Sequence, residues 1–202
     1  MRVLGLDLSS KTGFAVLDTD VQSKPSSLLK YGLIVAPPDK EYPIEEYRYL
    51  DVAIRISIAI GDIITEYKPN LIYIEQSNKG KNRHSQKFIE FIHCEVLTVI
   101  QSLGLDTKIT YIDTSFWRTA LSQRMTKEQR LHNKAVKKGE IRGKITPKHL
   151  SVKWVNENYK TEFKLKDNDI ADAICVATAG VILLNQIGKN IVDSEMIEKA
   201  LF

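Results

Sequence analysis

The stretch Val3-Leu4-Gly5-Leu6-Asp7 decides the fold of this chain, because it is an apolar run that ends in a carboxylate. The run is apolar on both faces, which is typical of a central strand in a sheet that is covered on both sides. A second run of the same form, Leu71-Ile72-Tyr73-Ile74-Glu75, occurs much later. Adjacent strands lie about 4.8 Å apart, so parallel pairing of these two would bring Asp7 and Glu75 within reach of one ion.

The remaining apolar patterns place strands and helices around these two runs. An antiparallel three-strand start is followed by alternating helices and strands, with a further helix start at Asp113-Thr114-Ser115. This order predicts an α/β fold with a mixed five-stranded sheet and helices on both faces. The strands are expected at 3–6, 13–17, 31–36, 71–75 and 108–112, and the helices at about 43–67, 84–102, 147–159 and 168–186.

Two further acids open the last predicted helix, in Asp169-Ile170-Ala171-Asp172. Residues three apart share a helix face, so Asp169 and Asp172 point the same way. Asp172 has apolar neighbours and lies beyond the first turn, where an unpartnered carboxylate would be costly to desolvate. Asp167 or Asn168 fits the N-cap of this helix. Whether Asp167 or Asp169 acts together with Asp172 stays open, and Asp7 could simply cap the turn that follows it.

Four carboxylates at one edge of a sheet need a counter-charge, since each raises the pKa of the others. Hard divalent cations take oxygen ligands, and the sequence offers no accompanying set of His or Cys. The pattern therefore predicts a site for Mg²⁺, with Mn²⁺ as a substitute.

A basic band sets part of the chain apart. Residues 122–153 hold ten Lys or Arg against Glu128 and Glu140, a local charge of +8 in a chain whose net charge is +4. Lysine and arginine gain affinity for a polyanion by displacing counterions from its phosphates. A solvated charged loop is the alternative. We expect one domain over 1–202 with a basic insertion at about 122–147.

Three motifs resemble those of RuvC-type Holliday junction resolvases, in the ribonuclease H-like superfamily. They are Leu4-Gly5-Leu6-Asp7 followed by Thr12-Gly13, then Ile74-Glu75-Gln76, then Asp169-Ile170-Ala171-Asp172-Ala173, in order along nearly the whole chain. The resemblance implies a ribonuclease H-like fold and a homodimeric endonuclease that resolves four-way junctions or other branched DNA. It also implies that Asp7, Glu75, Asp169 and Asp172 hold two divalent ions. Lys148 matches a catalytic basic residue near the site.

Contacts with DNA are expected from three basic regions. Relatives often carry an aromatic residue after Glu-Gln that can stack on a DNA base, whereas this chain has a polar loop there. Phe116 and Trp117 could supply such stacking, but an aromatic pair on a short helix is expected in the core. The insertion is interpreted as an arm that embraces a DNA branch and is mobile without DNA. The expected DNA-binding residues are Lys79, Lys81 and Arg83 in the loop, Arg118, and Lys134, Lys137, Lys138, Arg142 and Lys144 in the insertion.

Composition narrows the class of protein. With 43% apolar and 27% charged residues, the chain is not of the disordered class. We expect neither a signal peptide nor a membrane helix, and a cytoplasmic location in a bacterial or phage-infected cell. Cys94 and Cys175 lie in apolar helical patterns and are expected to be buried free thiols.

Other functions share parts of this pattern. A sugar-kinase or actin-like fold also begins with a strand that leads into Asp and Thr-Gly, but the length and the 10 glycines do not accommodate it comfortably. The same acids could serve a ribonuclease H-like, flap or debranching nuclease, or remain in a DNA-binding module that does not cut. The helix at 84–102 could form a dimer interface through Phe88, Phe91, Ile92 and Val96, or pack on the sheet.

Overall fold

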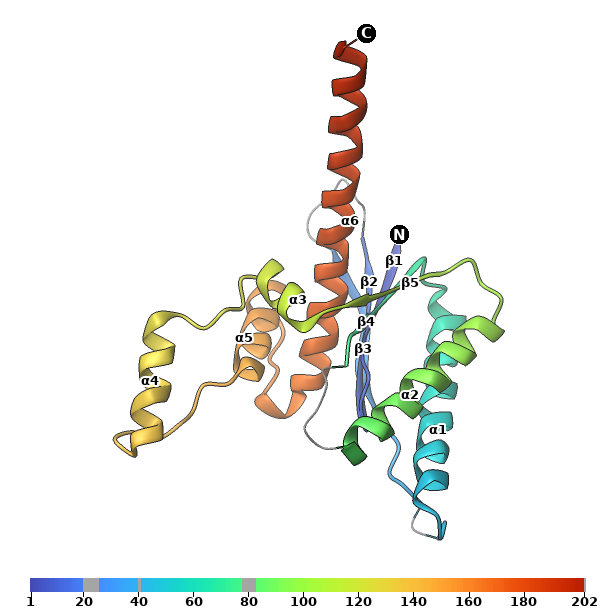
Figure 1. The fold of residues 1–202 in the computed structure, drawn as a ribbon, viewed down its shortest axis with the longest axis vertical. Helices are drawn as coiled ribbons and strands as arrows, with labels where there is room; N and C mark the ends of the chain where they lie inside the picture. Colours follow the sequence, from blue (N-terminus) through green and yellow to red (C-terminus); the bar gives the residue numbers. More distant parts are fainter. Residues whose placement is uncertain (20–25, 40, 78–82, 202) are drawn as a thin grey trace.

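The computed structural model describes residues 1–19, 26–39, 41–77 and 83–201, with side chains as far as Gln186. At its centre is a five-stranded sheet in the order β3-β2-β1-β4-β5 (Figure 1). The first three strands are antiparallel, whereas β4 and β5 run parallel to β1, so the predicted mixed α/β sheet is confirmed. The strands are β1 (Arg2–Asp7), β2 (Lys11–Asp18), β3 (Ser27–Val35), β4 (Leu71–Glu75) and β5 (Lys108–Ile112).

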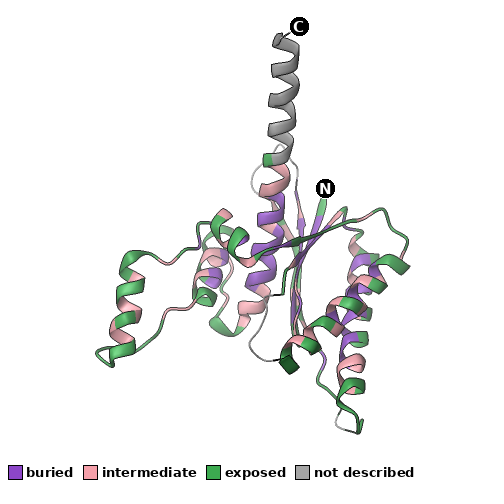
Figure 2. Cartoon of the chain, viewed as in Figure 1, coloured by how far each residue is buried: buried purple, intermediate pink, exposed green. Residues whose placement is uncertain are grey.

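Helices cover both faces of this sheet, as predicted. Successive residues of β1 point to opposite faces. Leu4 and Leu6 pack in one core with α1 (Glu45–Tyr67) and α2 (Arg83–Ser102). Val3 packs in the other core with α3 (Thr114–Ala120), α5 (Pro147–Tyr159) and α6 (Asn168–Leu201) (Figures 1 and 2). The side chains Ile92 and Val96 of α2 are fully buried in the first core, so packing within the chain accounts for that face of the helix.

The orientation of α1 about its axis differs from the sequence pattern. The apolar spacing that predicted this helix includes Tyr47, Ile54 and Ile58, and all three are exposed. The buried face carries Val52, which belongs to that spacing, together with Ala53, Ile56, Ile60 and Ile64, which do not. Because apolar residues occupy two faces of α1, periodicity alone could not decide which one meets the sheet.

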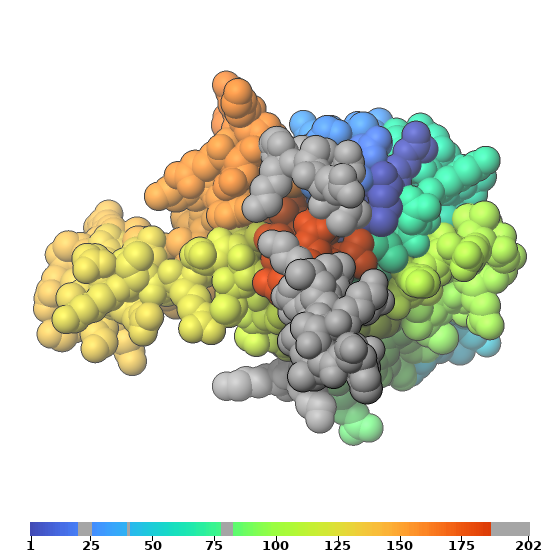
Figure 3. All heavy atoms as spheres, turned by 90° about the horizontal axis from the view of Figure 1, so that it is seen from above, coloured from blue at the N-terminus to red at the C-terminus, as the bar shows by residue number. Residues whose placement is uncertain are grey.

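The insertion contains a helix that the sequence analysis did not predict, α4 (Lys127–Lys138). Thr126 and Gln129 form a capping box at its start, and Gly139 ends it with a φ of 80°. None of its residues is buried. Figures 1 and 3 both show α4 standing out from the body of the molecule, joined to it at the ends of α3 and α5.

Three smaller expectations were wrong. The last helix continues to Leu201 rather than ending near Gln186. Asp167 does not cap that helix; it lies in a short 3-10 turn, η1 (Leu165–Asp167), where it accepts a hydrogen bond from the backbone N–H of Lys164 at 2.8 Å. Cys94 is exposed on α2, although Cys175 is buried as expected. Among the described residues, no helix is both long and apolar enough to cross a membrane.

Candidate active site

Asp7 and Glu75 end two neighbouring parallel strands. Leu6 of β1 pairs with Ile74 of β4, so the next residue on each strand lies at the same level of the sheet. The carboxyl ends of such strands are the usual place for a site in an open α/β sheet. Each side chain is only partly exposed, since the helices on both faces shield that edge.

Two glycines let α6 approach the sheet closely enough to add its own acids. A Cβ atom on Gly13 would lie 1.9 Å from the backbone oxygen of Asp169, and a Cβ atom on Gly5 would lie 2.4 Å from that of Ala173. No side chain fits in either gap. The first turns of α6 therefore rest directly on β1 and β2, which places Asp169 and Asp172 over the edge that carries Asp7.

The four acids influence one another electrostatically. Burial raises the pKa of Asp7 well above its usual value, and the charges of Glu75, Asp172 and Asp169 raise it further. Burial also raises the pKa of Glu75 and of Asp172, and the Asp172 charge adds to the shift at Glu75. We call these four residues the acidic cluster. A group of carboxylates that oppose one another's ionisation is a site that a cation would stabilise.

Basic and hydroxyl groups partly compensate this charge. Lys148 Nζ lies 3.3 Å from Asp169 Oδ1 and also donates to Asn168. Arg118 Nη2 lies 3.5 Å from Asp172 Oδ1, and Thr114 Oγ1 donates to Glu75 Oε1 at 2.6 Å. Lys148 and Arg118 both lower the pKa of Asp172, although burial outweighs them.

The acidic cluster has the donor chemistry for a hard divalent ion, but the side chains are turned to their protein partners. In the described part of the chain, no group of three or more His, Cys, Asp or Glu side chains is arranged to hold a metal ion as it stands. Asp169 and Asp172 face Lys148 and Arg118 instead. Rotation of these carboxylates toward Asp7 would exchange a loose ion pair for a metal ligand, and oxygen-only donors favour Mg²⁺ or Mn²⁺.

Comparisons with known proteins identify the fold. No family model matches the chain, and no curated protein matches it by sequence. Thermus thermophilus RuvC in complex with a Holliday junction substrate superposes with a TM-score of 0.64 at 13% identity, covering 89% of this chain and 92% of that one. The chain has the RuvC fold. The yeast mitochondrial Holliday junction resolvase Ydc2 is also similar, with a TM-score of 0.52 at 12% identity over 89% of this chain and 78% of that one.

On this RuvC fold, the basic residues expected to bind DNA separate into two groups. Arg118 is largely buried beside the acidic cluster, with 16% of its side chain exposed. Arg83 is exposed at the start of α2, and Lys79 and Lys81 lie outside the described residues. The exposed basic residues of the insertion are Lys134, Lys137, Lys138, Arg142 and Lys144.

The aromatic pair at the start of α3 was expected in the core, and the structure divides it. Trp117 is fully buried, whereas Phe116 is 38% exposed. The Trp117 ring supports Arg118, whose guanidinium carbon lies 4.0 Å from the ring centre. The sequence analysis also missed Gln123 and Ser151, two buried polar residues that adjoin Arg118. In the sequence, each of them is simply a polar residue in a helical or turn segment. Such residues are too common for this feature to identify a functional position.

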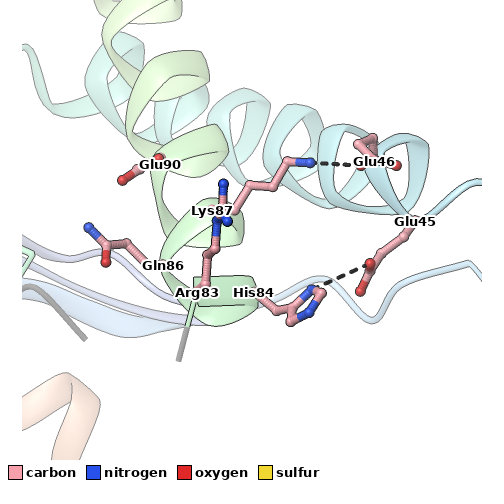
Figure 4. Close-up of a pocket in the computed structure, with 7 residues that line it drawn as sticks. All are labelled: Glu45, Glu46, Arg83, His84, Gln86, Lys87 and Glu90. Carbon is pink, nitrogen blue, oxygen red and sulfur yellow. Dashed lines mark hydrogen bonds and ion pairs between the residues drawn. The ribbon is translucent and has the colours of Figure 1, made fainter. Parts of the chain in front are cut away.

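A pocket of about 640 Å³ lies between the first turns of α1 and α2 (Figure 4). Its described lining contains none of the four acids. Charges of both signs face it, and two pairs lie close together: Lys87 Nζ is 2.7 Å from Glu46 Oε1 and His84 Nδ1 is 3.6 Å from Glu45 Oε2. This pocket is not where the cluster would act.

Proposed function

We propose that this chain is a divalent-metal-dependent endonuclease that resolves Holliday junctions or related branched DNA in recombination or repair. The observation that carries the proposal is the meeting of Asp7, Glu75, Asp169 and Asp172 at one edge of a RuvC-fold sheet. The cluster's partners include the cationic side chains of Lys148 and Arg118 and the hydroxyl of Thr114, which suit a phosphate ligand.

The acidic cluster would hold two Mg²⁺ ions, with Mn²⁺ as a substitute. When bound, such ions supply an activated water and stabilise the leaving oxygen of an in-line displacement at phosphorus. The four carboxylates would bind and orient them. We take Asp169 rather than Asp167 as the partner of Asp172, a choice supported by the Asp169 charge, which is among those that raise the pKa of Asp7. Lys148, 54% exposed and next to Asp169, would meet the phosphate of the scissile strand.

Branched DNA is the proposed substrate, by analogy with Thermus thermophilus RuvC in complex with its Holliday junction substrate. The exposed lysines of the insertion would contact the DNA backbone beyond the point of cleavage, as part of a single domain over 1–202. Symmetric incision of a four-way junction needs two sites related by a two-fold axis, so the working form would be a homodimer. A cytoplasmic location accompanies that substrate.

The test is a panel of DNA substrates incubated with the purified chain and Mg²⁺: a four-way junction, a flap and a linear duplex. We expect paired incisions in the junction, little cutting of the duplex, and no cutting with EDTA. Asp7→Asn should lower the rate by more than about 100-fold, the upper end of what loss of an outer partner of a metal costs. Equal cutting of all three substrates would contradict the proposed specificity for junctions. Full activity of the Asp7→Asn variant would contradict the assignment of the acidic cluster as the active site.

A further inference from the structure

A chain of buried hydrogen bonds leads from the base of the insertion to the acidic cluster. Gln123 Nε2 donates to Cys175 Sγ at 3.1 Å, and Ser151 Oγ donates to Gln123 Oε1 at 3.2 Å. Ser151 Oγ in turn accepts from Arg118 Nη1 at 3.0 Å, and Arg118 Nη2 faces Asp172. Gln123 is 6% exposed and Ser151 is fully buried. We call Gln123, Ser151 and Arg118 the relay.

Both ends of the insertion close on this relay. At the first end, Ser122 has a φ of 56°, an uncommon conformation for a residue with a side chain, and this turn precedes the inward-pointing Gln123. At the second end, the carbonyl oxygen of Pro147 accepts from Arg118 Nη1 at 3.2 Å. The guanidinium is therefore held by a backbone oxygen, a hydroxyl and the face of Trp117.

The pair that remains, Arg118 with Asp172, is unusually long. Charge-assisted N–H···O hydrogen bonds normally measure about 2.7 to 2.9 Å. Arg118 Nη2 stays 3.5 Å from Asp172 Oδ1, although both groups are shielded from water and attract each other strongly. Arg118 Nη1 is engaged by Ser151 and Pro147, which restrain the guanidinium beside Asp172. The Ser151 hydroxyl also lowers the pKa of Asp172, so Ser151 adjoins both members of the pair.

We propose that Gln123 and Ser151 are positioning residues that restrain Arg118 from a tight ion pair with Asp172, and thereby keep this carboxylate available to a divalent ion. This inference rests on the proposed function, and it explains why Gln123 and Ser151 are polar although they are buried. Residues that orient the groups around a metal ligand commonly change metal affinity when they are removed. Without the relay, Arg118 moves onto Asp172 and competes with the ion.

The experiment measures Mn²⁺ binding to the DNA-free chain by calorimetry. Ser151→Ala and Gln123→Met should each weaken Mn²⁺ binding about tenfold. The matched control is Ser57→Ala, which removes a serine of similar burial whose hydroxyl donates to Ile54 in the opposite core. That variant should bind Mn²⁺ like the wild type, and thermal unfolding of all variants shows whether each one is folded.

A double-mutant cycle separates positioning from a general packing role. In an Arg118→Gln background the competitor is gone, so adding Gln123→Met, whose side chain bonds Cys175 and Ser151 rather than Asp172, should change Mn²⁺ affinity by less than about twofold. An equal weakening in both backgrounds, or none in either, overturns the proposal. The readout is equilibrium binding, so it tests the relay separately from the proposed function. If the relay variants change Mn²⁺ affinity as expected but the chain cuts no junction, the proposed function is rejected and the role of the relay stands. If the chain cuts junctions but the relay variants leave Mn²⁺ affinity unchanged, the proposed function stands and the role of the relay is rejected.

Discussion

The acidic cluster and the insertion differ in how the fold holds them. The cluster lies where backbone meets backbone, with α6 resting on two glycines of the sheet. The insertion has no buried residue in α4 and holds itself together with caps and a clamp, in which Asn133 Nδ2 donates to the carbonyl of Ile145 and Oδ1 accepts from its N–H, both at 2.8 Å. The proposed metal site is therefore held by packing in the core, whereas the proposed DNA-binding surface depends on exposed charge.

The largest expected effect is at the close approach that builds the cluster. Gly13→Ala would place a Cβ atom 1.9 Å from the backbone oxygen of Asp169, so α6 must shift. Overpacking of this kind costs about 1–3 kcal/mol, and we expect junction cutting to disappear with it. Gly61→Ala is the control, since its Cβ would meet only the end of the Val99 side chain, at 2.9 Å. Denaturant unfolding and a cleavage assay measure both effects. Normal cutting by Gly13→Ala would show that close approach is not needed.

The charge of the cluster should appear as a pH-dependent instability without metal. The raised pKa of Asp7 means that the folded chain holds this proton more tightly than the unfolded chain does, so stability falls as the pH rises through that pKa. Asp7→Asn should therefore unfold at higher urea than wild type in EDTA at neutral pH. The advantage should shrink as the pH falls toward 3.8, the ordinary value of an Asp.

Exposed Asp106→Asn provides the control for that measurement, and it should change the stability little at any pH. Added Mg²⁺ should reverse the order, because the wild-type carboxylate gains its counter-ion and the variant does not. A wild type that is the more stable of the two in EDTA at neutral pH would contradict the repulsion within the cluster.

Changes in the insertion should affect DNA affinity rather than chemistry. Replacing Lys134, Lys137 and Lys138 with alanine should weaken junction binding and reduce the slope of log K against log salt by about 0.9 for each phosphate that the variant no longer neutralises. Titration of a labelled junction at several salt concentrations measures the slope. The pair Lys30 and Lys108, exposed elsewhere on the surface, is the control. An unchanged slope in the triple variant would exclude this surface from DNA binding.

The smallest effect is expected at the clamp inside the insertion. Asn133→Ala removes the two hydrogen bonds to Ile145, each worth about 0.5–1.5 kcal/mol, and a longer one to Met125 Sδ. It should open α4 locally without lowering global stability. Asn156 makes the same paired hydrogen bonds to the backbone of Phe163, at 3.0 and 2.9 Å, within the body of the protein. Asn156→Ala should lower the global unfolding temperature. Hydrogen exchange distinguishes the two, and an equal global destabilisation would mean that the insertion is part of the core.

Much of this architecture was predictable because the strands are short apolar runs with sharp ends. The mixed sheet, the covering of both faces, and the positions of Asp7 and Glu75 at strand ends agree with the prediction. The face of α1 that packs on the sheet was not predictable, since Ile54 and Ile56 are equally apolar and only one is buried. The helix α4 was not predicted either. Its sequence is dominated by basic residues and contributes no buried face, and the capping residues at its two ends stabilise it instead.

The sequence by itself determined which residues carry negative charge at strand and helix ends, because apolar periodicity and the position of each acid are local properties. Only the tertiary structure decided that these acids meet, since that depends on how closely α6 can approach Gly5 and Gly13. It also decided that Gln123 and Ser151 are buried and bonded to each other. A buried hydrogen bond between residues far apart in the chain leaves no periodic trace, because its energy comes from burial that the fold creates.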